Sequence, residues 1–363
     1  MAAPTTIRAL SVETLDIPLY APFGISAGAQ EIARNLLVVV ELADGTRGYG
    51  EAAPFPAFNG ETQAIAHAAI DAARSTVEGA DARAWRRVAA AIRHAMGPVG
   101  SAQCAIETAI LDALMRHARA PLWAFFGGAG TNLETDMTIT TGTVDDAFTA
   151  AQDILDRGIR IIKIKIGSGD LALDLDRVSA VAAVAPQSPL ILDGNAAFTA
   201  DEALQLLAQL GERGVAVALM EQPVAKDDWV GMQQVAQWGG VPVAADETAA
   251  DSSAALRIVQ ERAAHVVNIK LMKCGIVEAL DIAALCRAAR VRLMIGGMVE
   301  SILAMTTSAC FAAGQGGFHY VDLDMPLFMA ENPFEGGMVY QGGIIDLSQI
   351  AAGHGVSPKA RGA

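Results

Sequence analysis

The stretch at residues 159–169, IRIIKIKIGSG, has the pattern of a buried β-strand, and this strand carries two lysines. β-Branched residues fill alternate positions, and glycines close the stretch. Lys163 and Lys165 lie two residues apart, so their side chains point to the same face of the strand. Two cations there repel each other, and if buried they also lose hydration. The pair therefore calls for a functional explanation.

Outward from this strand, after residue 131, short apolar runs alternate with amphipathic helical stretches. The runs are TDMTITTG, IIKIKIG, PLILDGN, VALMEQP, PVAADET, HVVNIKL, VRLMIGG and FHYVDLD. Near-continuous apolar strands that alternate with helices predict a parallel sheet, and eight such units predict a closed (β/α)₈ barrel of the TIM type. A doubly wound open sheet usually has a Gly-rich phosphate loop after its first strand, and this chain has none there.

The region before the barrel has a different sequence pattern. NLLVVVELADGTRGYGEA, at residues 35–52, predicts a β-hairpin with an Asp-Gly turn. Residues 61–117 are alanine-rich and helical in pattern, and Ser101 is the expected N-cap of the helix in SAQCAIETAILDALMRHARA. We expect an α+β segment over residues 1–127, and loose order from residue 351 onward.

Composition limits the classes of partner. The chain has 363 residues, of which 52% are hydrophobic and 18% charged, and its formal charge is −14. Disorder is therefore not expected, and neither nucleic acid nor an anionic membrane is an expected partner. The four cysteines are far apart and fit buried free thiols in a reducing cytosol. With no secretion signal and no long apolar run, the sequence predicts a cytoplasmic protein without a membrane span.

Charged residues end successive apolar runs at a regular interval. From Lys165 to Asp193 is 28 residues, to Glu221 another 28, to Asp246 another 25, and to Lys270 another 24. One βα unit of a barrel takes about 30 residues, so each charge falls at the carboxyl end of a strand, where barrel side chains converge. Each residue alone could be a helix cap or a turn. Five of them in register favour one shared site.

Three carboxylates on adjacent strands, Asp193, Glu221 and Asp246, would repel one another without a cation. Oxygen ligands with no His or Cys nearby favour Mg²⁺ or a relative. Lys165 and Lys270 would then bracket whatever the metal holds. Such an arrangement suits removal of the proton α to a carboxylate, because a divalent cation can hold the charge of the resulting enediolate. Proton loss to one lysine and return from the other inverts the stereocentre.

Neighbouring positive charge explains the lysine pair. A lysine base needs a pKa lowered towards neutrality, and Lys163, together with the metal, would favour a neutral Lys165. Lys163 could also polarise the substrate carboxylate.

The motifs KIK, LDGN, MEQP, ADET and NIKLMKCG together resemble the muconate-lactonizing-like branch of the enolase superfamily. The resemblance implies a modified barrel, (β/α)₇β, over residues 128–325. It implies an α+β capping domain built from residues 1–127 and from residues 326–363, which return to it. It also implies one Mg²⁺ per subunit, two catalytic lysines and a homo-oligomer. The implied catalytic residues are Lys165 and Lys270, and the implied metal ligands are Asp193, Glu221 and Asp246.

The stretch YVDLDMPL indicates which reaction of this branch to expect. Asp322 and Asp324 share a face at the end of the eighth strand and resemble the Asp-x-Asp pair with which dipeptide epimerases hold the substrate's N-terminal ammonium. Two carboxylates attract a free amine, which a muconate or an N-acylated amino acid does not offer. A capped turn before Pro326 is the structural alternative. The same comparison places Thr138, Lys163, Asn195 and Met298 in the substrate site, and Glu300 beside Lys270.

Two loops of the capping domain limit the range of expected substrates. Relatives that act on Ala-Glu carry an arginine in the early loop, whereas YAPFGISAGAQ at residues 20–30 has no basic residue and places Gly28 near that position. AAPFPAFNG adds Phe55 and Phe58. We therefore expect a Mg²⁺-dependent epimerase of dipeptides with an apolar C-terminal residue, working by 1,1-proton transfer. An N-acyl amino acid racemase, a muconate-type cycloisomerase and a non-catalytic barrel that binds amino compounds are the alternatives.

Overall fold

The computed structural model describes residues 3–25 and 28–360, and its largest element is one curled parallel sheet of eight strands. The strands lie side by side in chain order, with seven helices between them, which confirms the expected (β/α)₇β arrangement. All eight apolar runs of the sequence became its strands. The strands are β5 (Met137–Ile139), β6 (Ile162–Lys165), β7 (Leu190–Asp193), β8 (Val217–Glu221), β9 (Val243–Ala245), β10 (Val266–Ile269), β11 (Arg292–Ile295) and β12 (Phe318–Val321).

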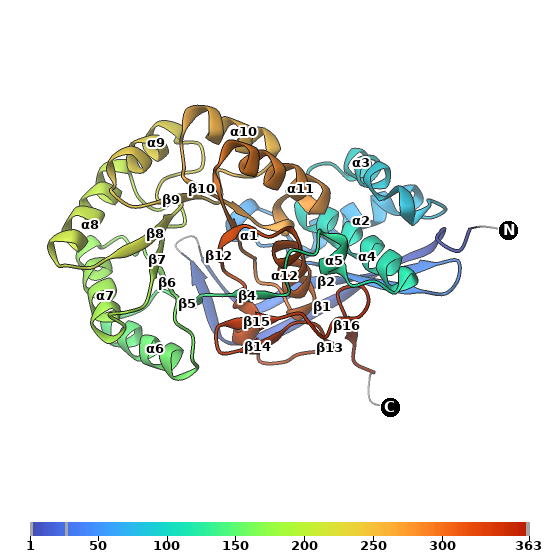
Figure 1. The fold of residues 1–363 in the computed structure, drawn as a ribbon, viewed down its shortest axis with the longest axis horizontal. Helices are drawn as coiled ribbons and strands as arrows, with labels where there is room; N and C mark the ends of the chain where they lie inside the picture. Colours follow the sequence, from blue (N-terminus) through green and yellow to red (C-terminus); the bar gives the residue numbers. More distant parts are fainter. Residues whose placement is uncertain (1–2, 26–27, 361–363) are drawn as a thin grey trace.

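Helices cover the outside of this sheet, and in Figure 1 those from α6 to α10 form an arc around the strands. Local signals start several of them. Thr143 and Thr199 each form a capping box with an acidic residue three positions later, and Asp170, Asp228 and Asp251 accept backbone N–H groups as N-caps. The helices are α6 (Val144–Asp156), α7 (Leu171–Val184), α8 (Ala200–Glu212), α9 (Trp229–Trp238), α10 (Ser252–Glu261), α11 (Leu271–Ala289) and α12 (Ile302–Gln315).

The seam between the first and last strands of the sheet is closed by side chains. The Thr135 hydroxyl accepts the N–H of Leu323 at 2.9 Å, and the carboxylate of Asp324 accepts the N–H of Thr138 at 2.7 Å. One backbone bond, from Asp136 N to Val321 O at 3.0 Å, lies between them. Since two polar side chains replace ladder bonds there, the seam brings charged groups into the barrel.

The N-terminal segment forms an antiparallel sheet packed against helices. Strands β2 and β3 pair through a turn in which Gly45 has a φ of +89°, as the Asp-Gly signal predicts. Gly48 and Gly50 let β3 approach α4 closely, because a Cβ at either would lie 2.2 or 2.0 Å from a carbonyl oxygen of the helix. The elements are β1 (Ile7–Ile25), β2 (Gly28–Leu42), β3 (Arg47–Ala52), α1 (Pro56–Asn59), α2 (Gln63–Val77), η1 (Ala82–Ala84), α3 (Trp85–Met96), α4 (Gly100–Ala118) and α5 (Leu122–Phe125).

The start of α4 differs from the expectation. The predicted N-cap, Ser101, lies inside the helix, whose N-cap is Val99 without a side-chain bond. Glu61 does the capping from a distant position: its carboxylate accepts the N–H of Gly100 at 2.8 Å, the N–H of Ser101 at 3.2 Å and the Ser101 hydroxyl. A buried carboxylate satisfies several free N–H groups at once, which a single serine cannot do.

The C-terminal segment contributes short strands beside both other parts of the chain. His354 is buried, and its Nε2 contacts the backbone oxygen of Tyr49 in β3 at 2.9 Å. Its backbone N–H donates to the carboxylate of Asp112 in α4. The expected loose order from residue 351 is therefore wrong for the described residues, which include a strand up to Pro358; residues 361–363 lie outside them. Its elements are η2 (Met325–Phe328), β13 (Phe334–Gly336), β14 (Val339–Gln341), β15 (Ile344–Asp346) and β16 (Val356–Pro358). β13 pairs with β16, and β15 pairs with β14 and with β4 (Asn132–Glu134), a strand that precedes the barrel.

Two expectations about the chain's chemistry can be compared directly with the structure. All four cysteines are free and buried. Within residues 3–25 and 28–360, no helix combines the length and apolar character that crossing a membrane requires.

Candidate active site

The five charged residues that end successive runs converge at one end of the barrel. Lys165, Asp193 and Glu221 are direct neighbours in the parallel ladder of β6, β7 and β8. Asp246 follows β9, and Lys270 follows β10 at the start of α11. All five are buried. The regular spacing in the sequence thus corresponds to one contiguous cluster.

Ion pairs connect the cluster. Lys165 Nζ lies 2.6 Å from Asp193 Oδ2, and Lys270 Nζ lies 2.8 Å from Asp246 Oδ2. Lys163 Nζ lies at its centre, 2.9 Å from Asp193 Oδ2, 2.8 Å from Glu221 Oε2 and 2.6 Å from Asp322 Oδ2. Each lysine is therefore neutralised by at least one carboxylate.

These contacts set the direction of two lysine pKa values. Burial lowers the pKa of Lys163 and of Lys270, but attraction to the surrounding carboxylates outweighs it, so both pKa values are raised above the ordinary value. The charged groups nearest to these two amines are carboxylates, which stabilise the ammonium form.

The carboxylates fit a hard divalent cation. Asp193, Glu221 and Asp246 are fully buried, and all offer oxygen atoms. Glu221 Oε2 and Asp246 Oδ2 accept no hydrogen bond from the described residues, although each lies in an ion pair with a lysine. Burial is the main influence raising the pKa of Glu221, followed by repulsion from Asp193. A cation among these oxygens would relieve that repulsion.

Surrounding residues orient the three carboxylates. Asn268 donates to Glu221 Oε1 at 2.6 Å, and Lys273 donates to Asp246 Oδ1 at 3.0 Å. Gln222 accepts the N–H of Asp246 at 2.9 Å, and its own φ of +34° is unusual for a residue other than glycine. Asn195 has a φ of +40°. Such strained residues cluster at functional sites, where surrounding structure holds them in place.

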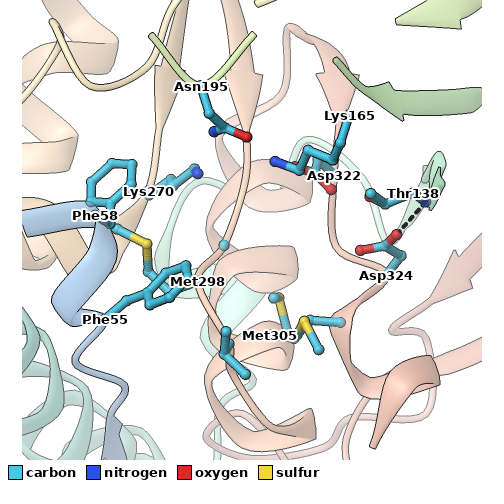
Figure 2. A pocket seen from close by; sticks show the side chains of 13 residues that line it. Phe55, Phe58, Thr138, Lys165, Asn195, Lys270, Met298, Met305, Asp322 and Asp324 are labelled. Atoms are coloured by element: carbon cyan, nitrogen blue, oxygen red, sulfur yellow. Dashed lines mark hydrogen bonds between the residues drawn. The ribbon is translucent and has the colours of Figure 1, made fainter. Parts of the chain in front are cut away.

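A pocket opens above this cluster (Figure 2). The lysines Lys165 and Lys270 point toward one another across it, with Asn195 above them. Of the residues predicted for the substrate site, Thr138, Asn195, Met298, Asp322 and Asp324 line the pocket, while Lys163 lies in the ion-pair cluster. The full lining is Phe55, Phe58, Thr138, Lys165, Asn195, Lys270, Gly297, Met298, Val299, Met305, Asp322, Asp324 and Met325.

The two sides of the pocket differ in chemistry. Phe55, Phe58 and Met298 lie together on one side, and the Lys270 Nζ is 5.0 Å from the centroid of the Phe58 ring. Asp322 and Asp324 lie on the other side, next to Thr138, whose N–H Asp324 accepts. A ligand with one apolar and one cationic end matches this division.

Sequence reasoning missed several polar residues of the site. Lys273 lies within NIKLMKCG and Asn268 within HVVNIKL, so their motifs gave a signal that was not used. Asp136 lies two residues before Thr138, just ahead of β5. Glu300, expected beside Lys270, accepts the N–H of Met298 at 2.7 Å; burial raises its pKa to about 8, and attraction to Lys270 partly offsets that rise.

Comparison with known proteins agrees with this geometry. Residues 8–127 match the family model "Mandelate racemase / muconate lactonizing enzyme, N-terminal domain", and residues 146–362 match "Enolase C-terminal domain-like". A curated relative, the aromatic dipeptide epimerase of Herpetosiphon aurantiacus, is 51% identical over 98% of this chain and 99% of its own.

Solved structures agree as well. A mandelate racemase/muconate lactonizing enzyme from Roseiflexus sp. is 64% identical, with a TM-score of 0.95 over 99% of this chain and 100% of its own. A dipeptide epimerase from Enterococcus faecalis, complexed with Mg and L-Leu-L-Tyr, is 30% identical, with a TM-score of 0.93 over 97% of this chain and 99% of its own. The chain therefore belongs to the mandelate racemase/muconate lactonizing enzyme family of the enolase superfamily, in its dipeptide epimerase branch.

Proposed function

We propose that this protein is a Mg²⁺-dependent dipeptide epimerase that inverts the α-carbon of the C-terminal residue by 1,1-proton transfer. The observation that carries the proposal is the pair Lys165 and Lys270, which face each other across one pocket. A carbon held between two amines can lose a proton to one and gain a proton from the other. The dipeptide epimerases among its relatives support the same reaction.

Asp193, Glu221 and Asp246 would hold the metal ion through their carboxylate oxygens. Bound there, Mg²⁺ supplies positive charge that makes negative charge on the substrate carboxylate less costly. Asp193 and Asp246 are also the carboxylates paired with Lys165 and Lys270. If these oxygens held the metal, Lys165 and Lys270 would each share their carboxylate partner with it, and both amines would be held less tightly by Asp193 and Asp246.

The lysines move the proton. One amine, in its neutral form, takes the proton from the α-carbon as the C–H bond breaks and its electron pair passes to the carboxylate group. The ammonium of the opposite lysine then delivers a proton to the other face of that carbon. Atoms and charge balance over the cycle, and the two lysines exchange protonation states.

The pocket supports a dipeptide with an apolar C-terminal residue. Phe55, Phe58 and Met298 would contact that side chain, while Asp322 and Asp324 would receive the amino end. Lys165 and Lys270 are the basic residues of the pocket lining, and the reaction occupies both. The early capping loop also bears on specificity, but positions 26 and 27 lie outside the described residues, so its part stays a prediction.

Deuterium uptake tests the reaction. In D₂O with Mg²⁺, the enzyme should incorporate deuterium at the α-carbon of Ala-Phe or Ala-Leu while epimerising it. Lys165→Ala and Lys270→Ala should each abolish epimerisation, since inversion needs both faces. Uptake that persists in the double variant would exclude these lysines as the bases, and no uptake by the wild type on any dipeptide would favour a barrel that only binds.

Two comparisons test the substrate class. Asp322→Asn should cripple turnover of free-amine dipeptides; full activity on an N-acyl amino acid would instead favour a racemase of the same branch. A higher kcat/KM for Ala-Glu than for Ala-Leu or Ala-Phe would contradict the apolar preference.

We also propose that the protein acts in the cytoplasm as a homo-oligomer. Gel filtration with light scattering would test the oligomeric state.

A further inference from the structure

A third buried carboxyl group lies beside Asp322 and Asp324, and nothing in the mechanism so far uses it. Asp136 comes just before β5, is 0% exposed and does not line the pocket. One carboxylate oxygen from each of Asp136, Asp322 and Asp324 lies within 4.8 Å of the other two. The three therefore form a compact group of acids on the polar side of the pocket, in which Asp322 and Asp324 line the pocket and Asp136 does not.

The partners of the three acids differ. Asp322 pairs with Lys163, and Asp324 accepts the N–H of Thr138. By contrast, neither oxygen of Asp136 accepts a hydrogen bond from any residue in the described part of the chain. Buried carboxyl oxygens without donors are costly and rare in folded proteins. A group kept under such conditions calls for a ligand that supplies the missing donors.

The spacing of the oxygens fits one kind of ligand. Acceptors placed about 2.8 Å from one tetrahedral nitrogen stand roughly 4.6 Å apart, a separation that the upper limit of 4.8 Å between these oxygens permits. A primary ammonium has three N–H bonds, one for each carboxylate. Its charge would also offset the repulsion among the three acids, of which Lys163 now relieves only part, because that lysine is shared with Asp193 and Glu221.

We propose that Asp136 is a third acceptor for the primary ammonium that Asp322 and Asp324 receive, so that each of the three carboxylates accepts one N–H bond. The proposal rests on the proposed function in one respect: the ammonium is taken to be the amino end of the dipeptide. Asp136 is then a specificity-determining residue that reaches the amino group from beneath the pocket floor. A secondary ammonium has only two N–H bonds, and an acylated amine has no positive charge. Each should therefore bind less well than a primary ammonium.

Asp136→Asn separates this role from a structural one. The amide keeps the shape but removes a carboxylate that has no partner, so the melting temperature of the substrate-free variant should stay equal or rise. Its KM for free-amine dipeptides should rise about tenfold, the loss expected for one charged hydrogen-bond partner, with kcat changed much less. The difference in KM between a dipeptide and its N-methylated form should be much smaller in the variant than in the wild type.

Asp112→Asn is the matched control, because Asp112 is another fully buried aspartate whose oxygens do have donors, from Tyr49, Arg116 and His354. It should lower the melting temperature and leave KM unchanged. If Asp136→Asn behaves in the same way, or leaves KM unchanged at any melting temperature, the proposal is wrong.

A binding measurement on the Mg²⁺-loaded enzyme keeps this test apart from the proposed reaction. Ammonium chloride should raise the melting temperature more than tetramethylammonium chloride at matched ionic strength, since tetramethylammonium has no N–H bond. Asp136→Asn should abolish that difference. Equal shifts by both salts in the wild type would overturn the ammonium site. Failure of the wild type to epimerise any dipeptide, with the ammonium difference intact, would instead refute the proposed reaction and leave the site standing.

Discussion

At the scale of single residues, the aromatic ring of Phe58 lies beside the proposed catalytic residue Lys270. The Phe58 ring lies 5.0 Å from Lys270 Nζ and lines the apolar side together with Phe55. An aromatic face attracts an ammonium and also offers contact area to an apolar substrate side chain. Phe58 therefore links the position of a base to the recognition of the substrate.

Phe58→Ala should lower kcat/KM for Ala-Phe and Ala-Leu by about tenfold and for Ala-Ala by much less, because the lost contact is with the larger side chain. Steady-state kinetics on the three dipeptides would measure this. Phe148→Ala serves as the control, since Phe148 is a half-exposed residue of α6 outside the pocket lining. An equal loss on all three substrates would mean that Phe58 acts through Lys270 alone.

At the scale of elements, a buried glutamate joins α4 to α11. Glu107 accepts the N–H of Val277 at 2.9 Å and bonds to the Gln103 side chain. Both lie beside Gly275, whose φ of +81° kinks α11 directly after the stretch that carries Lys270 and Lys273. A Cβ at Gly275 would come 2.6 Å from Gln103 and 2.9 Å from Glu107, so only glycine fits. This contact sets the course of α11, whose N-cap is Lys270.

Burial raises the pKa of Glu107 to about 7. Since its folded pKa exceeds its unfolded one, its contribution to stability is present in full below about pH 4.5 and is lost as the pH rises to 7. Glu107→Gln should therefore flatten the fall in the free energy of unfolding between pH 4.5 and 7, by roughly 3 kcal/mol.

Urea unfolding of both proteins across this range would measure the difference. Glu247 and Glu300, whose pKa values burial raises to about 8, are present in both proteins, so the comparison isolates Glu107. Parallel pH profiles for the two proteins would contradict the prediction.

At the scale of the whole molecule, one carboxylate fastens the N-terminal sheet to the barrel. Glu51 of β3 accepts the N–H groups of Ser301, at 3.0 Å, and Ala304, at 3.2 Å, at the start of α12. It also accepts the side chain of Asn35, which in turn donates to Val299 O at 2.8 Å. Val299 and its neighbour Met298 line the pocket, so this contact positions one wall of the site.

Glu51→Ala should lower the free energy of unfolding by about 3 kcal/mol or more, because several buried donors lose a charged acceptor. It should also raise KM, since the wall that carries Met298 loses its support. Chemical unfolding and steady-state kinetics would measure these effects. Glu41→Ala is the control: it removes a surface partner of Arg8 and Arg47, which should cost under about 1 kcal/mol and leave KM unchanged. Similar effects of the two variants would contradict the assignment.

Removal of the metal should leave the protein folded. Lys163, Lys165 and Lys270 all lie in ion pairs with the carboxylates that would hold Mg²⁺, so the metal-free site is already largely neutralised. Chelation should abolish epimerisation without changing far-UV circular dichroism. Adding back Mg²⁺ at about 100 times its Kd should stabilise the fold by about 2.7 kcal/mol. Unfolding on chelation, or a full Mg²⁺ effect in Asp193→Asn, would contradict this prediction.

The strand-helix alternation, the order of the strands and the meeting of five charged residues could all be predicted from the amino-acid sequence. These follow from hydrophobic periodicity and from chain spacing, because a barrel repeats the same geometry in each βα unit. Asp193, Glu221 and Lys165 could be placed together for that reason. The resemblance to a known branch added Asp322 and Asp324.

Contacts that no periodic rule encodes could be recognised only in the folded chain. Glu61 caps α4 from a distant position in place of Ser101, and Thr135 and Asp324 close the barrel seam. The direction of the lysine pKa shifts depended on which charges lie nearest in space, and the burial of Asp136 without a donor could be seen only after the chain had folded around it. Long-range hydrogen bonding and desolvation depend on three-dimensional neighbours, and local sequence does not specify those.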